Sequence, residues 1–166
     1  MLIYHPTHDA YHCVFRMLVI SEAIPELEVD KARILDFYLL FPSAISTMRL
    51  PSNLRGVRKI ADAIANPYHD PLNINTTFRE LRNIQDAALK CIAASGLIDV
   101  DRFSEGYVTR TVESIPIDLQ EKIDAFVSER GKVADIILGK ISKIELRGAN
   151  GLKQRSSLME YRYDVT

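Results

Sequence analysis

The sequence of 166 residues predicts a mainly α-helical fold: a winged helix-turn-helix-like domain with a small β-hairpin wing, then a long amphipathic helix and a terminal strand. Three observations support this prediction. The run at 33–41 is apolar around nearly its whole circumference, which is typical of a buried central helix. Three helical patterns are followed by two short strand-like segments, which is the winged-helix order. Apolar residues then recur at helical spacing from Leu119 to Ile144.

Length and composition indicate an ordinary soluble globular protein. Hydrophobic residues make up 47% of the chain and charged residues 26%, which excludes disordered and fibrous classes. We expect a domain over 1–113 and a C-terminal extension over 114–166 that packs on the domain or on a partner. A cytoplasmic location without membrane association is expected, because the N-terminus lacks a basic region followed by an apolar run. Cys13 and Cys91 are interpreted as buried free thiols in a reducing compartment.

A first helix is expected over residues 8–21, where apolar residues recur at three- and four-residue steps. The central helix should begin with Asp30 as its N-cap, supported by a hydrophobic staple between Val29 and Ile34. It should end before Pro42, because proline lacks the backbone donor and disfavours a helical residue in front of it.

The middle of the chain predicts two further helices separated by a loop. Apolar residues from Leu54 to Ile64 form one stripe, and Asn66-Pro67 and Asp70-Pro71 mark the loop. A longer helix is expected over Thr77–Ser95 and should end at Gly96 in a left-handed conformation.

Two strands are expected next, at 97–100 and 107–111, around a turn that contains Gly106. Asp118 has capping-box spacing to Glu121, and the stripe that follows fits one helix to Glu145 or two helices joined near Gly131. The stripe is expected to pack within the chain, with contact to another chain as the alternative. Tyr161, Tyr163 and Val165 alternate as a terminal strand would.

His5, His8, His12 and Cys13 are the only group with the composition of a metal site. His8 and His12 would share one helix face, but no glutamate lies between them to act as a general base. A second ligand pair is also missing, because His69 stands alone. Polar residues at the start of a helix are therefore the preferred interpretation, and no metal or other cofactor is expected.

The sequence lacks a phosphate-binding glycine loop and a nucleophile elbow, so no enzymatic activity is expected. Cys13 follows His12 directly, and adjacent helical residues do not face each other. Asp36 and Arg33 carry charges on the central helix and could pair with each other, with Arg16 or with Arg162. Structural ion pairs are their expected role, since buried charges persist when partnered.

Nucleic-acid binding is the alternative function. The candidate contacts are Arg79 and Arg82 on the expected recognition helix, with Arg55, Arg58 and Lys59 as backbone contacts. The formal net charge of −1 and the interleaved Glu80 and Asp86 weaken attraction to phosphate. DNA contact through a complex is therefore favoured over a free-standing winged-helix transcriptional regulator.

Several short segments together resemble the middle-component subunits of ABC-three component systems, which are prokaryotic conflict operons that include Lamassu-like defence. The segments are Ile3-Tyr4-His5-Pro6, Asp9-Ala10-Tyr11-His12-Cys13-Val14-Phe15-Arg16, the Arg33–Pro42 helix, Ile84-Gln85-Asp86-Ala87-Ala88, Ala94-Ser95-Gly96-Leu97-Ile98, Asn150-Gly151-Leu152-Lys153 and Leu158-Met159-Glu160-Tyr161-Arg162-Tyr163.

The resemblance implies a non-catalytic accessory subunit that links an SMC-like ABC ATPase to an effector, often a nuclease, in defence against phage or plasmids. Such subunits are expected to carry a winged-helix-like domain. The C-terminal stripe and the final aromatic residues are the candidates for contact with the partners, since aromatic anchors dominate many interfaces. The candidate partner-binding residues are Phe126, Ile137, Ile141, Tyr161 and Tyr163.

Overall fold

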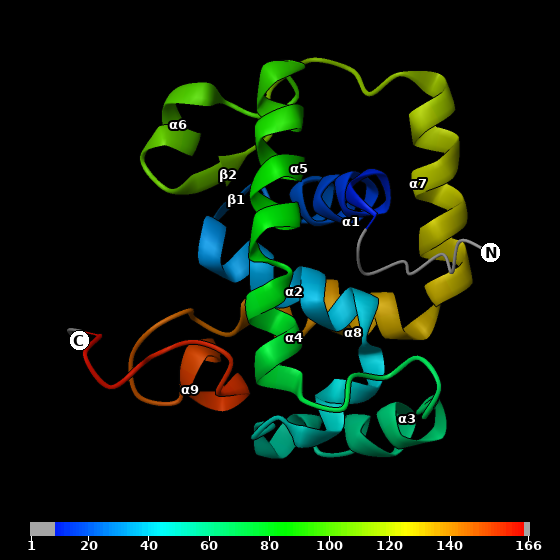
Figure 1. Ribbon diagram of the computed structural model, residues 1–166, viewed down its shortest axis with the longest axis vertical. Coiled ribbons are helices and arrows are strands. Elements are labelled where there is room, and N and C mark those ends of the chain that lie inside the picture. Colours follow the sequence, from blue (N-terminus) through cyan, green and yellow to red (C-terminus); the bar gives the residue numbers. More distant parts are fainter. Residues whose placement is uncertain (1–8, 165–166) are drawn as a thin grey trace.

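The computed structural model describes residues 9–164 and shows a mainly helical fold with a small two-stranded antiparallel sheet (Figure 1). No helix in this range is long and apolar enough to cross a membrane. The described elements are α1 (Ala10–Ala23), β1 (Glu26–Glu28), α2 (Val29–Leu40), α3 (Val57–Ala63), α4 (Ile74–Glu80), α5 (Arg82–Ala94), α6 (Val100–Ser104), β2 (Tyr107–Thr109), α7 (Ile117–Arg130), α8 (Lys132–Gly139) and α9 (Leu152–Ser156), with short 3-10 helices at Pro42–Thr47, Ser52–Leu54 and Ile141–Lys143.

Helix α2 lies at the centre of the molecule, and every residue from Lys31 to Leu39 is buried. This confirms the predicted buried central helix and its end before Pro42. The predicted N-cap is wrong: Glu28 precedes the helix, and Asp30 lies in its first turn. The reason is the preceding strand, because the Val29 N–H donates to the Gly106 carbonyl at 2.9 Å and so fixes where the helix begins.

Helix α1 packs against α2, α5 and α7, and it begins two residues later than predicted. Asp9 caps it by accepting a hydrogen bond from the Tyr11 N–H at 2.8 Å. The helix buries a continuous run of side chains from Phe15 to Ser21, which includes the charged residue Arg16. Helix α1 therefore forms one wall of the core that encloses α2.

The predicted Thr77–Ser95 helix is present as two helices, α4 and α5, which stand end to end in Figure 1. Asn73 caps α4 by accepting from the Thr76 N–H at 3.0 Å, so the helical region begins earlier than predicted. The interruption at Leu81 is local, because its carbonyl still accepts from the Gln85 N–H at 2.9 Å. Gly96 follows with φ +74°, which confirms the predicted left-handed terminator.

The predicted β-hairpin between 97–100 and 107–111 is formed only in part: the Asp99 N–H donates to the Thr109 carbonyl at 2.8 Å, but the first segment is not a regular strand. Strand β2 pairs with β1, with Leu27 opposite Val108, whereas Ile98 makes only an isolated bridge to Arg110. Helix α6 takes the place of the first strand's end, because Asp99 caps it by accepting from the Arg102 N–H at 2.8 Å. Arg102 also ties α6 to β1, with its Nη2 at 2.7 Å from Glu26 Oε1.

The long C-terminal stripe forms two helices, as the alternative with a joint near Gly131 predicted. Gly131 has φ +51°, a conformation that non-glycine residues rarely adopt, so the helix cannot continue through it. The predicted cap is wrong, because Pro116 precedes α7 and Asp118 lies in its first turn. The helical run ends at Gly139 instead of Glu145.

Helices α7 and α8 pack on the preceding part of the chain: α7 contacts α1, and α8 contacts α1, α2 and α3. The hydrophobic core therefore continues across the predicted boundary at 113/114, and Ile137 and Ile141 are fully buried in it. The predicted terminal strand is not formed at Tyr161–Asp164, and Val165 lies outside the described residues. Glu160 Oε1 accepts from the N–H groups of Tyr161 and Arg162, which turns the backbone there.

Candidate functional site

A buried ion pair joins α1 to α2 at the centre of the molecule. Arg16 Nε donates to Asp36 Oδ1 at 2.6 Å, and Arg16 Nη2 lies 3.4 Å from Asp36 Oδ2. The two side chains are 2% and 0% exposed. Burial alone would lower the pKa of Arg16, but the Asp36 carboxylate more than offsets this and raises the pKa. Among the pairings that the sequence left open, the structure therefore selects Arg16 for Asp36.

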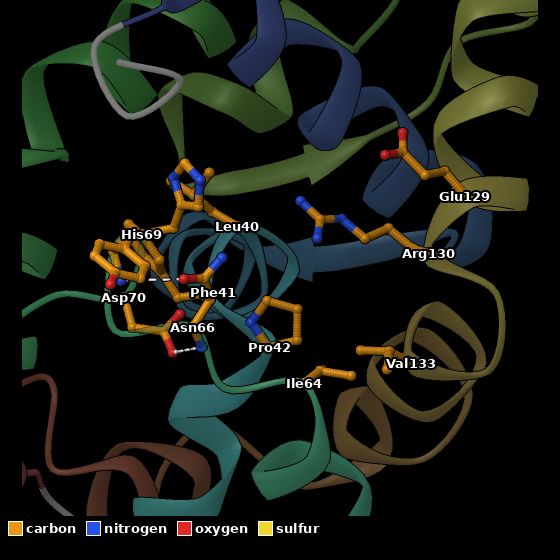
Figure 2. A pocket seen from close by; sticks show the side chains of 11 residues that line it. Leu40, Phe41, Pro42, Ile64, Asn66, His69, Asp70, Glu129, Arg130 and Val133 are labelled. Atoms are coloured by element: carbon orange, nitrogen blue, oxygen red, sulfur yellow. Dashed lines mark hydrogen bonds between the residues drawn. The ribbon is translucent and has the colours of Figure 1, made fainter.

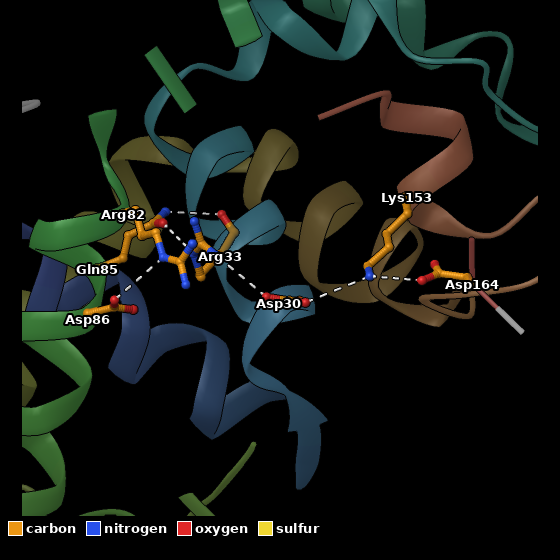
Figure 3. A network of polar contacts seen from close by, with 7 residues as sticks. All are labelled: Asp30, Arg33, Arg82, Gln85, Asp86, Lys153 and Asp164. Atoms are coloured by element: carbon orange, nitrogen blue, oxygen red, sulfur yellow. Dashed lines mark hydrogen bonds and ion pairs between the residues drawn. The ribbon is translucent and has the colours of Figure 1, made fainter. Parts of the chain in front are cut away.

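Gln85 extends this pair to α5. Its Nε2 donates to Asp36 Oδ2 at 2.8 Å and to the Arg33 carbonyl at 3.1 Å. Its Oε1 accepts from Arg33 Nε at 3.1 Å, and Arg33 Nη1 lies 3.4 Å from Asp30 Oδ1 (Figure 3). Gln85 thus uses both ends of its amide to hold α5 on α2.

Lys153 of α9 carries the network to the end of the described chain. Its Nζ lies 3.8 Å from Asp30 Oδ2 and 3.4 Å from Asp164 Oδ1, as Figure 3 shows. Lys153 is itself buried, so these two carboxylates supply its counter-charges. Polar contacts therefore fix α9 against the start of α2.

The two cysteines lie in different environments. Cys13 is buried with its Sγ 3.9 Å from Asp36 Oδ2, and burial followed by the charge of Asp36 raises the pKa of its thiol. The prediction that Cys91 is also buried is wrong, because Cys91 is exposed on α5. Ala88, Leu89 and Ile92 form the inner face of that helix, and position 91 falls outside it.

This difference predicts selective thiol chemistry. In the native protein, Ellman's reagent is expected to titrate one thiol rapidly, and the Cys91→Ser variant is expected to lose this reaction, because only a thiolate reacts and Cys13 is kept neutral and enclosed. Both thiols should react in denaturant. A rapid native reaction that survives in Cys91→Ser and disappears in Cys13→Ser would contradict this assignment.

A pocket of about 660 Å³ lies between the end of α2, the 66–70 loop and the junction of α7 with α8 (Figure 2). The loop is held in shape by its own side chains, since Asn66 Oδ1 accepts from the Tyr68 N–H and Asp70 Oδ2 from the Asn66 N–H. The lining residues are Leu40, Phe41, Pro42, Ile64, Asn66, Tyr68, His69, Asp70, Glu129, Arg130 and Val133.

Arg130 is the cation of this pocket. Figure 2 shows its guanidinium extending into the middle of the pocket, with Glu129 at the edge. Burial lowers the pKa of Arg130, the charge of Glu129 opposes this shift, and the charge of Arg16 adds a smaller lowering effect. The guanidinium lies 5.3 Å from the centre of the Phe126 ring, and no described residue forms a hydrogen bond or ion pair with it.

The predicted partner-binding residues do not form one surface. Ile137 and Ile141 are fully buried, so the stripe serves the core and these two residues are not available to a partner. Phe126 and Tyr161 are half-buried, and Tyr163 is 86% exposed near the end of the described chain. Phe126 alone among these five approaches the pocket, through its contact with Arg130.

The predicted nucleic-acid contacts are exposed but lie on separate elements. Arg55, Arg58 and Lys59 lie at and before the start of α3, and the guanidinium of Arg58 donates to the Met48 carbonyl at 3.2 Å. Arg79 lies on α4, and Arg82 on α5 is 3.9 Å from Asp86. Asp86, one of the two acids that the sequence places among the candidate contacts, is therefore within ion-pair distance of Arg82.

Of the predicted metal-like group, His5 and His8 lie outside the described residues. His12 Nε2 lies 3.9 Å from Asp9 Oδ2, and residues 9–164 contain no cluster of three potential metal ligands. The sequence missed Arg130 and the loop that faces it. The sequence signal for this loop was the presence of Tyr68 and His69 between Asn66-Pro67 and Asp70-Pro71.

Comparison with known families covers nearly the whole chain. Residues 2–164 match the family model described as "ABC-three component (ABC-3C) system Middle Component 5". No curated protein and no solved structure matches the chain.

Proposed function

The chain belongs to the Middle Component 5 family of ABC-three component systems, and from this membership we propose that it is a non-catalytic adaptor subunit. It joins an SMC-like ABC ATPase to an effector, which in some systems is a nuclease, in defence against phage or plasmids. The observation that carries the proposal is the family match over 2–164, because a middle component belongs to a system with further components.

The geometry supports a role in binding other proteins. The charged groups at the centre are committed to one another and hold helices together. The pocket beside Arg130, in contrast, is open to a ligand and has an apolar floor. Tyr68, which lines it and is 94% exposed, is an aromatic anchor of the kind that interfaces use.

The fold supports the winged-helix part of the proposal in its order of elements. Strand β1 lies between α1 and α2 and pairs with β2, and the Ile98–Arg110 bridge adds a third segment beside β2. Helix α6 lies in the chain between this third segment and β2. We propose that this layout serves as a scaffold for partner proteins, with DNA reached through the complex.

Co-expression tests the adaptor role. The full chain, tagged, is expressed with the ABC ATPase and the effector of the same system, and all three are expected to co-purify at modest salt. Absence of both partners from the purified material would contradict the proposal. A sequence-selective, salt-dependent DNA shift by the isolated chain would instead favour a free-standing regulator, and stoichiometric metal in the purified protein would favour a metal-dependent enzyme.

A further inference from the structure

We propose that the pocket at the α7–α8 junction receives a segment of a partner component that carries a single carboxylate between apolar residues, and that Arg130 binds this carboxylate. The inference rests on the proposed adaptor function and identifies the surface and the ligand chemistry through which it operates. The segment's apolar side chains would fill the floor, and its carboxylate would meet the guanidinium in the middle of the pocket.

The size and floor of the pocket fit a short peptide segment. A volume of about 660 Å³ accommodates a few side chains and lies within the range of specific ligand sites. Leu40, Phe41 and Val133 offer apolar surface from α2 and α8, and Ile64 adds to it from the end of α3. Tyr68 stands at the rim, where an aromatic side chain can cover a bound segment.

The charge of the ligand follows from Arg130. The guanidinium is partly buried, and no described residue replaces the hydrogen bonds to water that burial removes. The downward shift of its pKa has the same cause. A carboxylate replaces the lost hydrogen bonds to water, because it accepts two parallel N–H bonds from the guanidinium.

The acids at the pocket limit the ligand to one carboxylate. Glu129 lies at the edge, and Asp70 is already engaged with the Asn66 N–H at 2.7 Å. Their charges repel a run of acidic residues and also a phosphate backbone, so a nucleic acid is disfavoured here. An isolated Asp or Glu with apolar neighbours matches the arrangement.

The test uses the full chain co-expressed with its two partner components and compares two charge reversals. Arg130→Glu is expected to weaken the complex roughly 30-fold or more, because truncating or reversing one member of an enclosed charge pair removes both the attraction and the solvation of the other. Lys132→Glu makes the same charge change at an exposed neighbouring position outside the pocket and is expected to bind like the parent. Arg130→Lys, which lacks the fork, should be intermediate.

A photo-cross-linking residue in place of Tyr68 identifies the occupant. The expected product joins the pocket to a partner segment with an Asp or Glu between apolar residues, read by mass spectrometry. Products with residues 1–8 of the same chain, with a second copy, or with a segment that lacks a carboxylate would overturn the proposal. Equal binding by Arg130→Glu and Lys132→Glu, in a complex that forms, would overturn it while leaving the adaptor function intact. Failure of the parent chain to bind any partner would remove the adaptor function itself.

Discussion

Replacing Asp36 by alanine is expected to lower the free energy of unfolding by about 3–5 kcal/mol, because Arg16 is left buried without its counter-charge. Gln85 also loses the acceptor of its 2.8 Å hydrogen bond. Equilibrium urea denaturation followed by circular dichroism measures the effect. The chain is expected to unfold at markedly lower urea with an unchanged slope.

Asp30→Ala is the matched control. Its carboxylate is 39% exposed, and without it Lys153 keeps Asp164 and Arg33 keeps Gln85 as partners, so the expected loss is about 1 kcal/mol or less. Asp36→Asn keeps the shape of the side chain and removes the charge, and it is expected to lie close to Asp36→Ala. Equal destabilisation by Asp30→Ala and Asp36→Ala would contradict the expectation that the buried Arg16–Asp36 pair contributes more to stability than the pairs of Asp30.

Phe37→Ala is expected to cost about 3–5 kcal/mol of the free energy of unfolding, because it leaves a cavity at the centre of the core. The Phe37 ring is fully buried and lies 5.4 Å from the ring centre of Phe41 and 5.6 Å from that of Phe78. Three elements therefore meet at this side chain: α2, the turn after it, and α4. The same denaturation experiment measures the loss.

Tyr68→Ala removes an aromatic side chain of similar size from the surface and is expected to change the free energy of unfolding by no more than about 0.5 kcal/mol. A small effect of Phe37→Ala, comparable with that of Tyr68→Ala, would mean that α2 is not the centre of the folded core.

Local chemistry predicted most of the helices. Pro42 ends α2 because proline lacks a backbone N–H, and Gly131 separates α7 from α8 because glycine adopts a positive φ. Both effects depend on a single residue type and can be predicted from the sequence. Strand β1 was not predicted, for the opposite reason. The partner of β2 lies on β1, and the Thr109 hydroxyl donates to Glu26 across 83 positions of sequence, so no local pattern contains the pairing.

The candidate site could be predicted only in part. The sequence placed Arg16 among the possible partners of Asp36, because a charge within an apolar helix requires a counter-ion. It did not single out Arg130, whose position matters only once the 66–70 loop has folded across from α7. Ile137 and Ile141 show the converse limit, since an apolar stripe has the same pattern whether it faces its own core or another chain.

Helix α7 buries only Ile123 completely, whereas α2 buries nine consecutive residues. Opening of α7 therefore exposes less apolar surface than opening of α2, and the amide hydrogens of α7 are expected to exchange before those of α2. Arg130 is the last residue of α7, directly before the glycine joint. A partner that binds the Arg130 guanidinium is thus expected to slow amide hydrogen exchange along α7. The exchange rate of α7 would then report whether the pocket is occupied.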